Sequence, residues 1–421
     1  MQTRLLDSLR ASADGQEADQ ILRSCVHCGF CTATCPTYQI LGDELDGPRG
    51  RIYQIKNVLE GEPVTRQTQR HLDRCLTCLN CMTTCPSGVD YHRLVDIGRQ
   101  YVETRVRRPL SERLLRWGLR QVVPYPRRFV PLVRIGQALR PLLPTSLRAK
   151  LPPAAPAALT SSGAEVATPA PTRRVILLAN CVEPTLTPGV PAATRRVLAR
   201  LGIETLVAGG CCGAVSQHLA APEQARGFMR RNIDAWWPAI AAGADAILIT
   251  ASGCGAMVKD YGTLLRDDPV YAEKAARVTA LARDLGELLA AADLARLPNP
   301  FARGLPRRIA FHPPCSLQHG QGLAGRVEAL LRGVGFDLVP VADSHSCCGS
   351  AGTYSILQPT LSRQLRDQRL AALEQPGAGL IATANVGCQS HLQGAARLPV
   401  WHWIELFDPQ RVFCSPSGSP Q

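Results

Sequence analysis

One cysteine spacing occurs twice near the start of this chain and constrains its fold more than any other feature. Each copy reads Cys-x-x-Cys-x-x-Cys-x-x-x-Cys-Pro, and the copies begin at Cys25 and Cys75. Three thiolates spaced three residues apart let one loop surround a cubane iron–sulfur cluster, and the fourth cysteine, followed by proline, ligates the cluster of the other copy. We therefore predict two [4Fe–4S] clusters with interleaved ligands. The first set is Cys25, Cys28, Cys31 and Cys85, and the second is Cys75, Cys78, Cys81 and Cys35.

Zinc and disulfide bonds are the alternatives for so many cysteines. Structural zinc sites usually take two ligands from each of two Cys-x-x-Cys-like knuckles that a longer loop separates. Here four cysteines lie within eleven residues, twice, each time followed by proline. Disulfide frameworks are typical of small secreted domains, but this chain has 421 residues and starts without an apolar signal-peptide region. The 17 cysteines therefore indicate iron in a reducing compartment.

Most of the positive charge is concentrated in one segment. The formal net charge is +13, and residues 105–150 contain twelve Lys or Arg but one acid, Glu112, so the rest of the chain carries only +2. Because the basic character is local, we do not expect nucleic acid as a partner. A zinc-stabilised nucleic-acid-binding module that uses this segment is the rival hypothesis from another class of function.

An amphipathic helix is predicted at the start of the basic segment. Leu110, Leu114, Trp117 and Val122 recur at helical spacing, with arginines between them. Such a helix either rests on an anionic membrane or packs its apolar stripe on the protein's own core and leaves the arginines in water. The sequence leaves both interpretations open.

The residues before the basic segment are predicted to be mostly α-helical, as in a helical ferredoxin-type domain. Between the two motifs, apolar residues recur at helical spacing over 52–59, and Gly61 ends that helix. Further helices are predicted from Thr65 to the second motif and over 91–105. Residues 151–171 are rich in Ala and Pro and have the composition of a flexible linker.

From Arg173 onward, a strand–helix pattern with embedded cysteines occurs twice. The intervals between its cysteines are 30 and 42 residues in the first copy and 32 and 40 in the second, which indicates an internal duplication. Strands alternating with helices predict a parallel sheet in each copy, with the cysteines at the carboxyl ends of strands, where α/β folds place their sites. The cysteines are Cys181, Cys211, Cys212 and Cys254, then Cys315, Cys347, Cys348 and Cys388.

The predicted fold class is therefore multidomain α+β, with a helical ferredoxin-type domain followed by two tandem α/β Cys-Cys-Gly domains with parallel sheets. The predicted limits are 1–104 for the two-cluster domain, 105–172 for the basic amphipathic segment and linker, 173–297 for the first Cys-Cys-Gly domain, and 298–421 for the second with its tail.

The chemistry of the two later sets of four thiols is open on the sequence alone. Four thiolates meet the ligand requirement of a further iron–sulfur cluster in one or both copies, and the glycine after each cysteine pair lets the backbone approach a bulky group. A thiol–disulfide pair and a substrate or quinone pocket are the alternatives. His312 and His345 lie beside the second set and either relay protons, tune a cluster or are structural. Cys414, in a Ser-, Pro- and Gly-rich tail, is expected to have no role.

At these motifs the chain resembles a known family over nearly its whole length. That family comprises the iron–sulfur subunits of two-electron dehydrogenases and of heterodisulfide reductase, and the resemblance is strongest to those of bacterial glycolate oxidase. In heterodisulfide reductase the modules end in Cys-x-x-Cys, whereas here Ala251 and Asn385 replace the first cysteine of that pair. This departure counts against an enlarged noncubane cluster and against disulfide reduction. The stretches that carry the resemblance are 25–38, 42–61, Asn232–Ile240 and His312–Cys315.

The resemblance implies an electron-transfer iron–sulfur subunit of glycolate oxidase (glycolate dehydrogenase). It implies one or two flavin-binding partner subunits that oxidise glycolate to glyoxylate, and delivery of the electrons, one at a time, to a respiratory quinone-type acceptor. Cluster potentials, which span roughly −700 to +450 mV, permit such a downhill path. This chain alone is not expected to oxidise substrate. The alternative is the corresponding subunit of a lactate or anaerobic glycerol-3-phosphate dehydrogenase.

No run of eighteen or more mostly apolar residues occurs, so no membrane-spanning helix is predicted. With the reducing compartment that the cysteines indicate, we expect a cytoplasmic protein, peripheral on the cytoplasmic face of the inner membrane.

Overall fold

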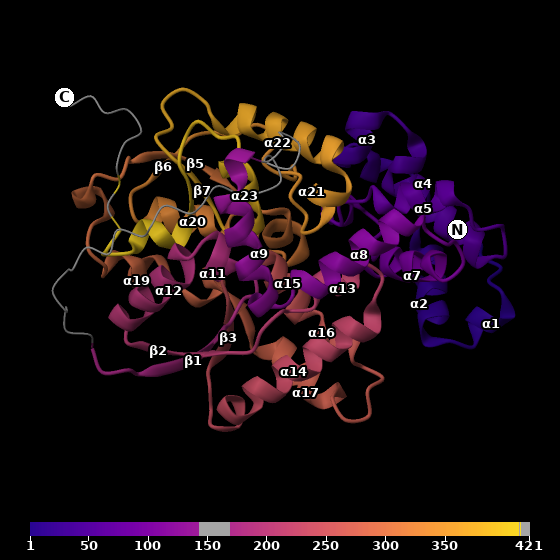
Figure 1. Cartoon of the computed structure of the whole chain (residues 1–421), viewed down its shortest axis with the longest axis horizontal. Coiled ribbons are helices and arrows are strands. Elements are labelled where there is room, and N and C mark those ends of the chain that lie inside the picture. Colours follow the sequence, from indigo (N-terminus) through magenta and orange to yellow (C-terminus); the bar gives the residue numbers. More distant parts are fainter. Residues whose placement is uncertain (143–168, 412, 414–421) are drawn as a thin grey trace.

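A helical region and two α/β halves follow one another along the chain (Figure 1). The computed structural model describes residues 1–142, 169–411 and 413. The predicted linker at 151–171 lies mostly outside these residues, and Cys414 lies outside them entirely. The fold class predicted from the sequence is confirmed: helices form the N-terminal region, and each of the two halves contains a parallel sheet.

The N-terminal region owes its helices to the predicted apolar spacing. Ile52, Ile55 and Leu59 are buried on one face of α4 and pack with Leu94 of α7. The Thr65 hydroxyl caps α5 by accepting the N–H of residue 68 at 3.2 Å. The elements are α1 (Asp7–Arg10), α2 (Ala13–Ser24), η1 (Phe30–Thr32), α3 (Pro36–Leu41), η2 (Glu44–Asp46), α4 (Pro48–Leu59), α5 (Arg66–Asp73), α6 (Asn80–Thr84) and α7 (Tyr91–Glu103).

Both halves contain a four-stranded parallel sheet. The strand order is β2-β1-β3-β4 in the first sheet and β6-β5-β7-β8 in the second, so the two sheets have the same topology. In each order the first three strands along the chain are neighbours, and their carboxyl ends meet at one edge. The strands are β1 (Arg173–Leu178), β2 (Ile203–Ala208), β3 (Ala246–Ile249) and β4 (Ala282–Asp284), then β5 (Arg308–His312), β6 (Asp337–Leu338), β7 (Ile381–Thr383) and β8 (Val400–His402).

The two halves share one apolar core. Buried residues of both sheets, among them Val175, Leu177, Ile309 and Phe311, belong to a single contact cluster. The first half adds α11 (Glu183–Leu186), α12 (Gly189–Arg200), α13 (Ala214–His218), α14 (Pro222–Ala241), α15 (Ser252–Lys259), α16 (Tyr261–Leu264), α17 (Ala272–Leu281), α18 (Leu285–Leu288) and α19 (Ala291–Ala295). The second half adds η4 (Pro300–Arg303), the π-helix η5 (Ser316–Gly320), α20 (Arg326–Gly333), α21 (Tyr354–Leu357), α22 (Pro359–Leu373), α23 (Val386–Gln393) and η6 (Trp403–Phe407).

The predicted amphipathic helix is α8 (Leu110–Val122), which α9 (Pro126–Ala138) and η3 (Arg140–Leu142) follow. Its apolar stripe faces outward: Leu110, Leu114 and Trp117 are 67%, 58% and 57% exposed. The interpretation that this stripe packs on the protein's own core is therefore wrong. Arg116 of α8 lies inward instead, because it pairs with Asp73 at the end of α5, with Nη2 and Oδ1 3.0 Å apart, whereas Arg113 is exposed.

Membrane-spanning segments are not found among the helices of the described residues, because none combines sufficient length with sufficient apolar character. This finding agrees with the absence of a long apolar run in the sequence.

Candidate iron–sulfur sites

The cysteines of the two N-terminal motifs line two cavities. The first cavity, of about 440 Å³ and open to solvent, has Cys25, Cys28 and Cys31 of the first motif in its lining, together with Cys85 of the second. The end of α2 and the turn η1 position the first three cysteines, and the chain turns away after Cys85 at Pro86. The structure thus brings the first predicted ligand set together.

The second cavity, of about 300 Å³, is lined by Cys75, Cys78 and Cys81 of the second motif and by Cys35 of the first. Cys81 also lines the first cavity, so the two cavities are neighbours. The second cavity therefore presents three thiols from one motif and a fourth from the other, and the first presents such a set together with Cys81. Four thiols are the donor set that a cubane cluster needs. Which of these thiols bind iron stays a prediction.

The two cluster loops have left-handed backbone at matching positions. The φ angle is +62° at His27 and +86° at Gly29 in the first loop, and +53° at Thr77 and +62° at Leu79 in the second. A non-glycine residue pays roughly 1–2 kcal/mol for this conformation. In the second loop it directs the Thr77 N–H to Cys75 Sγ, 3.4 Å away. Strain at matching positions indicates that both loops are shaped around sulfur atoms.

A buried arginine stands beside the second cavity. Arg51 belongs to the lining, is 1% exposed, and pairs with Asp46, with Nη2 and Oδ1 3.4 Å apart. Burial raises the pKa of the Cys75 thiol, but the charges of Arg51 and Arg99 and the hydrogen bonds from Tyr91 and Thr77 together outweigh burial, so this pKa lies below its ordinary value. The site therefore favours a thiolate at Cys75, which is the form that binds metal.

The four thiols of the first half lie together at the carboxyl edge of its sheet. Cys181 follows β1, the pair Cys211 and Cys212 follows β2, and Cys254 lies in the first turn of α15 after β3. Neighbouring thiols in the order 181, 211, 212, 254 are close enough to shift one another's pKa. The thiols of Cys181 and Cys212 lower the pKa of Cys211, and the Gly213 N–H, 3.5 Å from Cys211 Sγ, adds to this effect.

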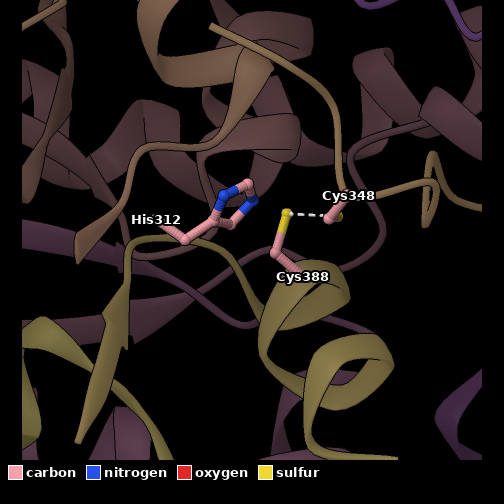
Figure 2. A group of neighbouring side chains, drawn as sticks. All are labelled: His312, Cys348 and Cys388. Carbon is pink, nitrogen blue, oxygen red and sulfur yellow. Dashed lines mark hydrogen bonds between the residues drawn. The ribbon is translucent and has the colours of Figure 1, made fainter. Parts of the chain in front are cut away.

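The second half repeats this arrangement. Cys315 and Cys347 have their sulfur atoms 3.8 Å apart, and those of Cys348 and Cys388 are 3.2 Å apart. Figure 2 shows the second pair with His312, whose ring is directed toward the two thiols. One nitrogen of His312 and both sulfur atoms lie within 4.8 Å of one another. The predicted eight thiols of the two halves thus form two compact sets of four.

One buried residue beside the second thiol set was not predicted from the sequence. Arg369 of α22 donates from Nε to His312 Nδ1 at 3.0 Å, although 57 residues separate the two. The duplication contains a signal for it: α14 and α22 align with an offset of 137 residues, so Arg369 occupies the position of Asn232 in the first half. The second half therefore has a buried positive charge near its thiols where the first half has a neutral amide.

Comparisons with known proteins agree with this arrangement. A family model described as a 4Fe-4S dicluster domain matches residues 21–89, and one described as a cysteine-rich domain matches residues 175–259 and 309–393. The chain is 58% identical over 414 residues to a protein of Escherichia coli strain K12 named glycolate oxidase iron-sulfur subunit, covering 97% of this chain and 98% of that protein. The chain belongs to the glycolate oxidase iron–sulfur subunit family. As a member, it is an iron–sulfur, electron-transfer subunit of an oxidoreductase complex.

Two more distant relatives show how the similarity falls in identity and in length. A Bacillus subtilis strain 168 protein named probable glycolate oxidase iron-sulfur subunit is 31% identical over 87% of both chains. A Bacillus licheniformis protein named lactate utilization protein A is 28% identical over 52% of this chain and 91% of its own length. Membership of the family thus rests on the relatives that match this chain over most of its length, whereas lactate utilization protein A matches only about half of it.

Proposed function

We propose that this chain carries electrons, one at a time, from the reduced flavin of partner subunits that oxidise glycolate to glyoxylate to a quinone-type acceptor. Glycolate oxidation releases two electrons, a flavin holds both, and an iron–sulfur cluster accepts one, so clusters in series divide the pair. The observation that carries the proposal is the pair of neighbouring cavities that share Cys81 and present one complete set of four thiols each. Substrate oxidation is assigned to the partners, not to this chain.

The interleaved ligand assignment is part of this proposal. When bound, cubane clusters supply reversible one-electron chemistry. The chain's own task is to hold the two sites close together and at suitable potentials. The proposed ligands are Cys25, Cys28, Cys31 and Cys85 at the first cavity and Cys75, Cys78, Cys81 and Cys35 at the second.

The surroundings of the two cavities suggest the direction of electron flow. At the second cavity, Tyr91 Oη lies 3.5 Å from Cys75 Sγ, and Asp46 is shared by Arg51 and Arg74, which leaves the group with a net positive charge. Hydrogen bonds to sulfur and nearby positive charge stabilise the reduced state of a cluster. The first site reaches the surface at Cys28, which is exposed, whereas none of the second set of cysteines is exposed. We therefore expect electrons to enter at the first site and move to the second.

The proposal includes contact with a membrane through a surface that we call the α8–α9 surface. It consists of the apolar side chains Leu110, Leu114, Leu115, Trp117, Leu132, Ile135 and Leu139, all of them well exposed to solvent. Arginines that pair with no carboxylate of the described residues lie on the same two helices, which suits an anionic lipid surface. They are Arg113, Arg127, Arg128 and Arg134.

The α8–α9 surface also adjoins the first set of cysteine-rich thiols. Tyr125, at the start of α9, packs against Phe228 with ring centroids 5.6 Å apart. Phe228 in turn contacts Cys181 and Cys211. An acceptor that approaches through the membrane would thus reach the protein next to a thiol set, which supports a quinone-type acceptor.

Flotation with anionic liposomes tests the membrane contact. The double variant Leu114→Glu/Trp117→Glu is expected to lose at least tenfold in binding, since each exposed apolar side chain contributes about 1.5–3 kcal/mol when buried in lipid. Val270→Glu is the control, because Val270 is as exposed but belongs to the loop between α16 and α17. Equal binding by the wild type and the double variant would contradict membrane contact through the α8–α9 surface.

The electron-transfer role is tested in the complex copurified with its flavin subunits. Anaerobic glycolate is expected to bleach the flavin and to produce the EPR signals of reduced clusters. Flavin bleaching without cluster signals would contradict the proposal.

A second candidate is the subunit of a lactate dehydrogenase, because several relatives are named lactate utilization protein A and are 27–30% identical over 52% of this chain. The same experiment distinguishes the two, since the 2-hydroxy acid that bleaches the flavin identifies the substrate. Glycerol 3-phosphate, the remaining alternative, is included in the assay.

A further inference from the structure

The two cysteine-rich halves differ at two buried positions beside their thiols. His312 ends β5, and Leu178 ends β1 at the matching position of the first half. Arg369 of α22 corresponds to Asn232 of α14. This correspondence holds in space, because Gly349 packs on the Ser362 carbonyl and Gly213 packs on that of the matching residue, Ala225. One half therefore has an ionic and polar pair where the other has an apolar residue and an amide.

The hydrogen bond from Arg369 fixes the tautomer of His312. A guanidinium donates and cannot accept, so His312 Nδ1, which receives Arg369 Nε at 3.0 Å, carries no proton. The proton of the neutral ring is then on Nε2. This atom is fully buried and has no partner among the described residues. An N–H with this proton points toward Cys348 and Cys388, as Figure 2 shows.

A second buried histidine, His402, shows by comparison that the unpaired Nε2–H of His312 is unusual. His402, which ends β8, also accepts at Nδ1, from the Ile404 N–H at 3.3 Å, and its Nε2 lies 3.1 Å from the Thr250 carbonyl. Both histidines are fully buried at the end of a strand. His402 thus uses both ring nitrogens within the fold, whereas the donor of His312 has only the thiol set before it. A buried donor costs free energy unless it finds an acceptor.

Arg369 brings a positive charge to the same place. It is 2% exposed, and its Nη1 donates to the carbonyls of Ala342 and Asp343 at 3.0 and 2.8 Å. Its Nη2 has no partner, and no carboxylate of the described residues forms an ion pair with it. A buried cation without an anion is strongly unfavourable. The arrangement therefore fits an anionic group bound to the thiols of this half.

In the described part of the chain, the first half has no imidazole donor and no buried guanidinium beside its thiols. Its side-chain donor to sulfur is Asn180, whose Nδ2 lies 3.5 Å from Cys254 Sγ, and in the second half Asn385 Nδ2 lies at the same distance from Cys388 Sγ. Leu178 is apolar, and the amide of Asn232 is used within the fold: its Nδ2 donates to the Cys211 carbonyl at 2.9 Å, and its Oδ1 accepts the Gly210 N–H at 2.8 Å. A group held by the first set of thiols would meet neither the imidazole donor nor the buried guanidinium charge.

The second half is also the one that contacts the second cluster cavity. Cys78 lies in one contact cluster with Cys315 and Cys347. Asn80, inside the second motif, donates to the His345 carbonyl at 3.3 Å, and Thr83 Oγ1 lies 3.0 Å from His319 Nδ1. These contacts hold the loop before Cys347 against the cluster loop.

We propose that the second set of thiols holds an iron–sulfur group that takes electrons directly from the cluster of the second cavity, and that His312, oriented by Arg369, donates a hydrogen bond from Nε2–H to a sulfur of that group. In the step, the cluster of the second cavity is oxidised by one electron and the group in the second half is reduced by one. No covalent bond forms or breaks, and no proton moves. The inference rests on the proposed electron-relay function. His312 and Arg369 are positioning residues that raise the potential of this group above that of any group in the first half.

The test compares His312→Leu, which reproduces the first half, with His312→Gln, whose amide can accept from Arg369 and still donate to sulfur. The probe is potentiometric EPR of the full chain after anaerobic reconstitution with iron and sulfide. Cys348→Ala identifies the signal of the second half. His312→Leu is expected to lower the midpoint potential of that signal by about 59 mV, a tenfold change in its reduction equilibrium, whereas His312→Gln leaves it near the wild-type value.

His402→Leu is the control for the loss of a buried histidine as such, and it is expected to leave that potential unchanged. Three results would overturn the inference while the signals of the two N-terminal clusters persist: no iron lost in Cys348→Ala, zinc in place of iron in the second half, or equal potentials in His312→Leu and the wild type. Absence of the N-terminal clusters themselves would instead contradict the proposed function.

Discussion

The two duplicated units of this chain differ in how alike their copies are. The cluster loops have the same cysteine spacing and the same left-handed positions, at His27 and Gly29 and at Thr77 and Leu79. The cysteine-rich halves have the same sheet order and the same thiol sets, but differ in the side chains around them. A cubane fixes the loop that surrounds it, and therefore both loops are alike. A set of thiols at a sheet edge does not fix the side chains around it. The two halves therefore differ in these surrounding side chains.

The largest expected effect tests whether the cluster loops exchange ligands. Cys28→Ala/Cys85→Ala removes two thiols of one proposed set and is expected to lose one cluster, or about four of eight irons. Cys28→Ala/Cys35→Ala removes one thiol from each set and is expected to damage both clusters. Iron and sulfide analysis after anaerobic purification measures the difference. The opposite ranking would mean that each motif binds its own cluster.

A second difference lies at the end of the last strand of each half. Asp284 caps α18, with its Oδ1 2.9 Å from the Gly286 N–H, and His402 caps η6. Burial raises the pKa of Asp284 to about 7 and lowers that of His402 to about 4. In the fold, Asp284 is therefore protonated up to about pH 7 and His402 is neutral down to about pH 4, so the two groups affect stability over different pH ranges.

The signs of the two pH effects follow from these shifts. The raised pKa of Asp284 contributes stability that is lost as pH rises from about 4 to 7, so Asp284→Asn should gain about 2–4 kcal/mol relative to the wild type over that range. The lowered pKa of His402 contributes stability that is lost as pH falls from about 6.5 to 4, so His402→Gln should gain relative to the wild type toward acid.

Urea unfolding midpoints of the two variants and the wild type at pH 4.5, 6 and 8 measure both effects. Asparagine is a good helix cap, so Asp284→Asn changes the charge and retains the cap. Parallel pH profiles for all three proteins would contradict the assignment of neutral side chains at these positions.

The smallest effect concerns the glycines that follow the cysteine pairs. Gly213 and Gly349 both have positive φ, +95° and +84°, so alanine is strained at either position. An added Cβ would meet the Ser362 carbonyl oxygen at 2.5 Å beside Gly349, but the Ala225 carbonyl oxygen at 3.1 Å beside Gly213. Gly349→Ala should therefore be more destabilising than Gly213→Ala by about 1–3 kcal/mol. Thermal unfolding of both variants checks this order. Equal losses of stability would mean that the backbone strain at positive φ, and not the contact of the added Cβ, determines the effect.

The sequence predicted what depends on spacing along the chain. The helices around 52–59 and 91–105, the parallel sheets and the grouping of the thiols follow from local periodicity and from strand order. The limits predicted at 104, 172 and 297, and the identity of the iron ligands, stay predictions.

Features that depend on distant partners were not predictable in the same way. The orientation of α8 depends on Asp73, which precedes that helix by 37 residues and draws Arg116 inward. The pair of His312 and Arg369 forms only because α22 crosses the end of β5. Neither contact has a signature in local spacing. The aligned repeats alone contained a hint, in the replacement of Asn232 by Arg369.

The central claim is that twin cysteine loops seat two clusters side by side in one electron path. Low-temperature EPR of the anaerobically reduced wild-type protein, with spin counting and iron analysis, tests it most directly. The account predicts at least about eight irons per chain and two cluster spins that broaden each other's signals, because the two cavities share Cys81. A protein that contains zinc in place of iron, or that stays colourless after reconstitution with iron and sulfide, would contradict it.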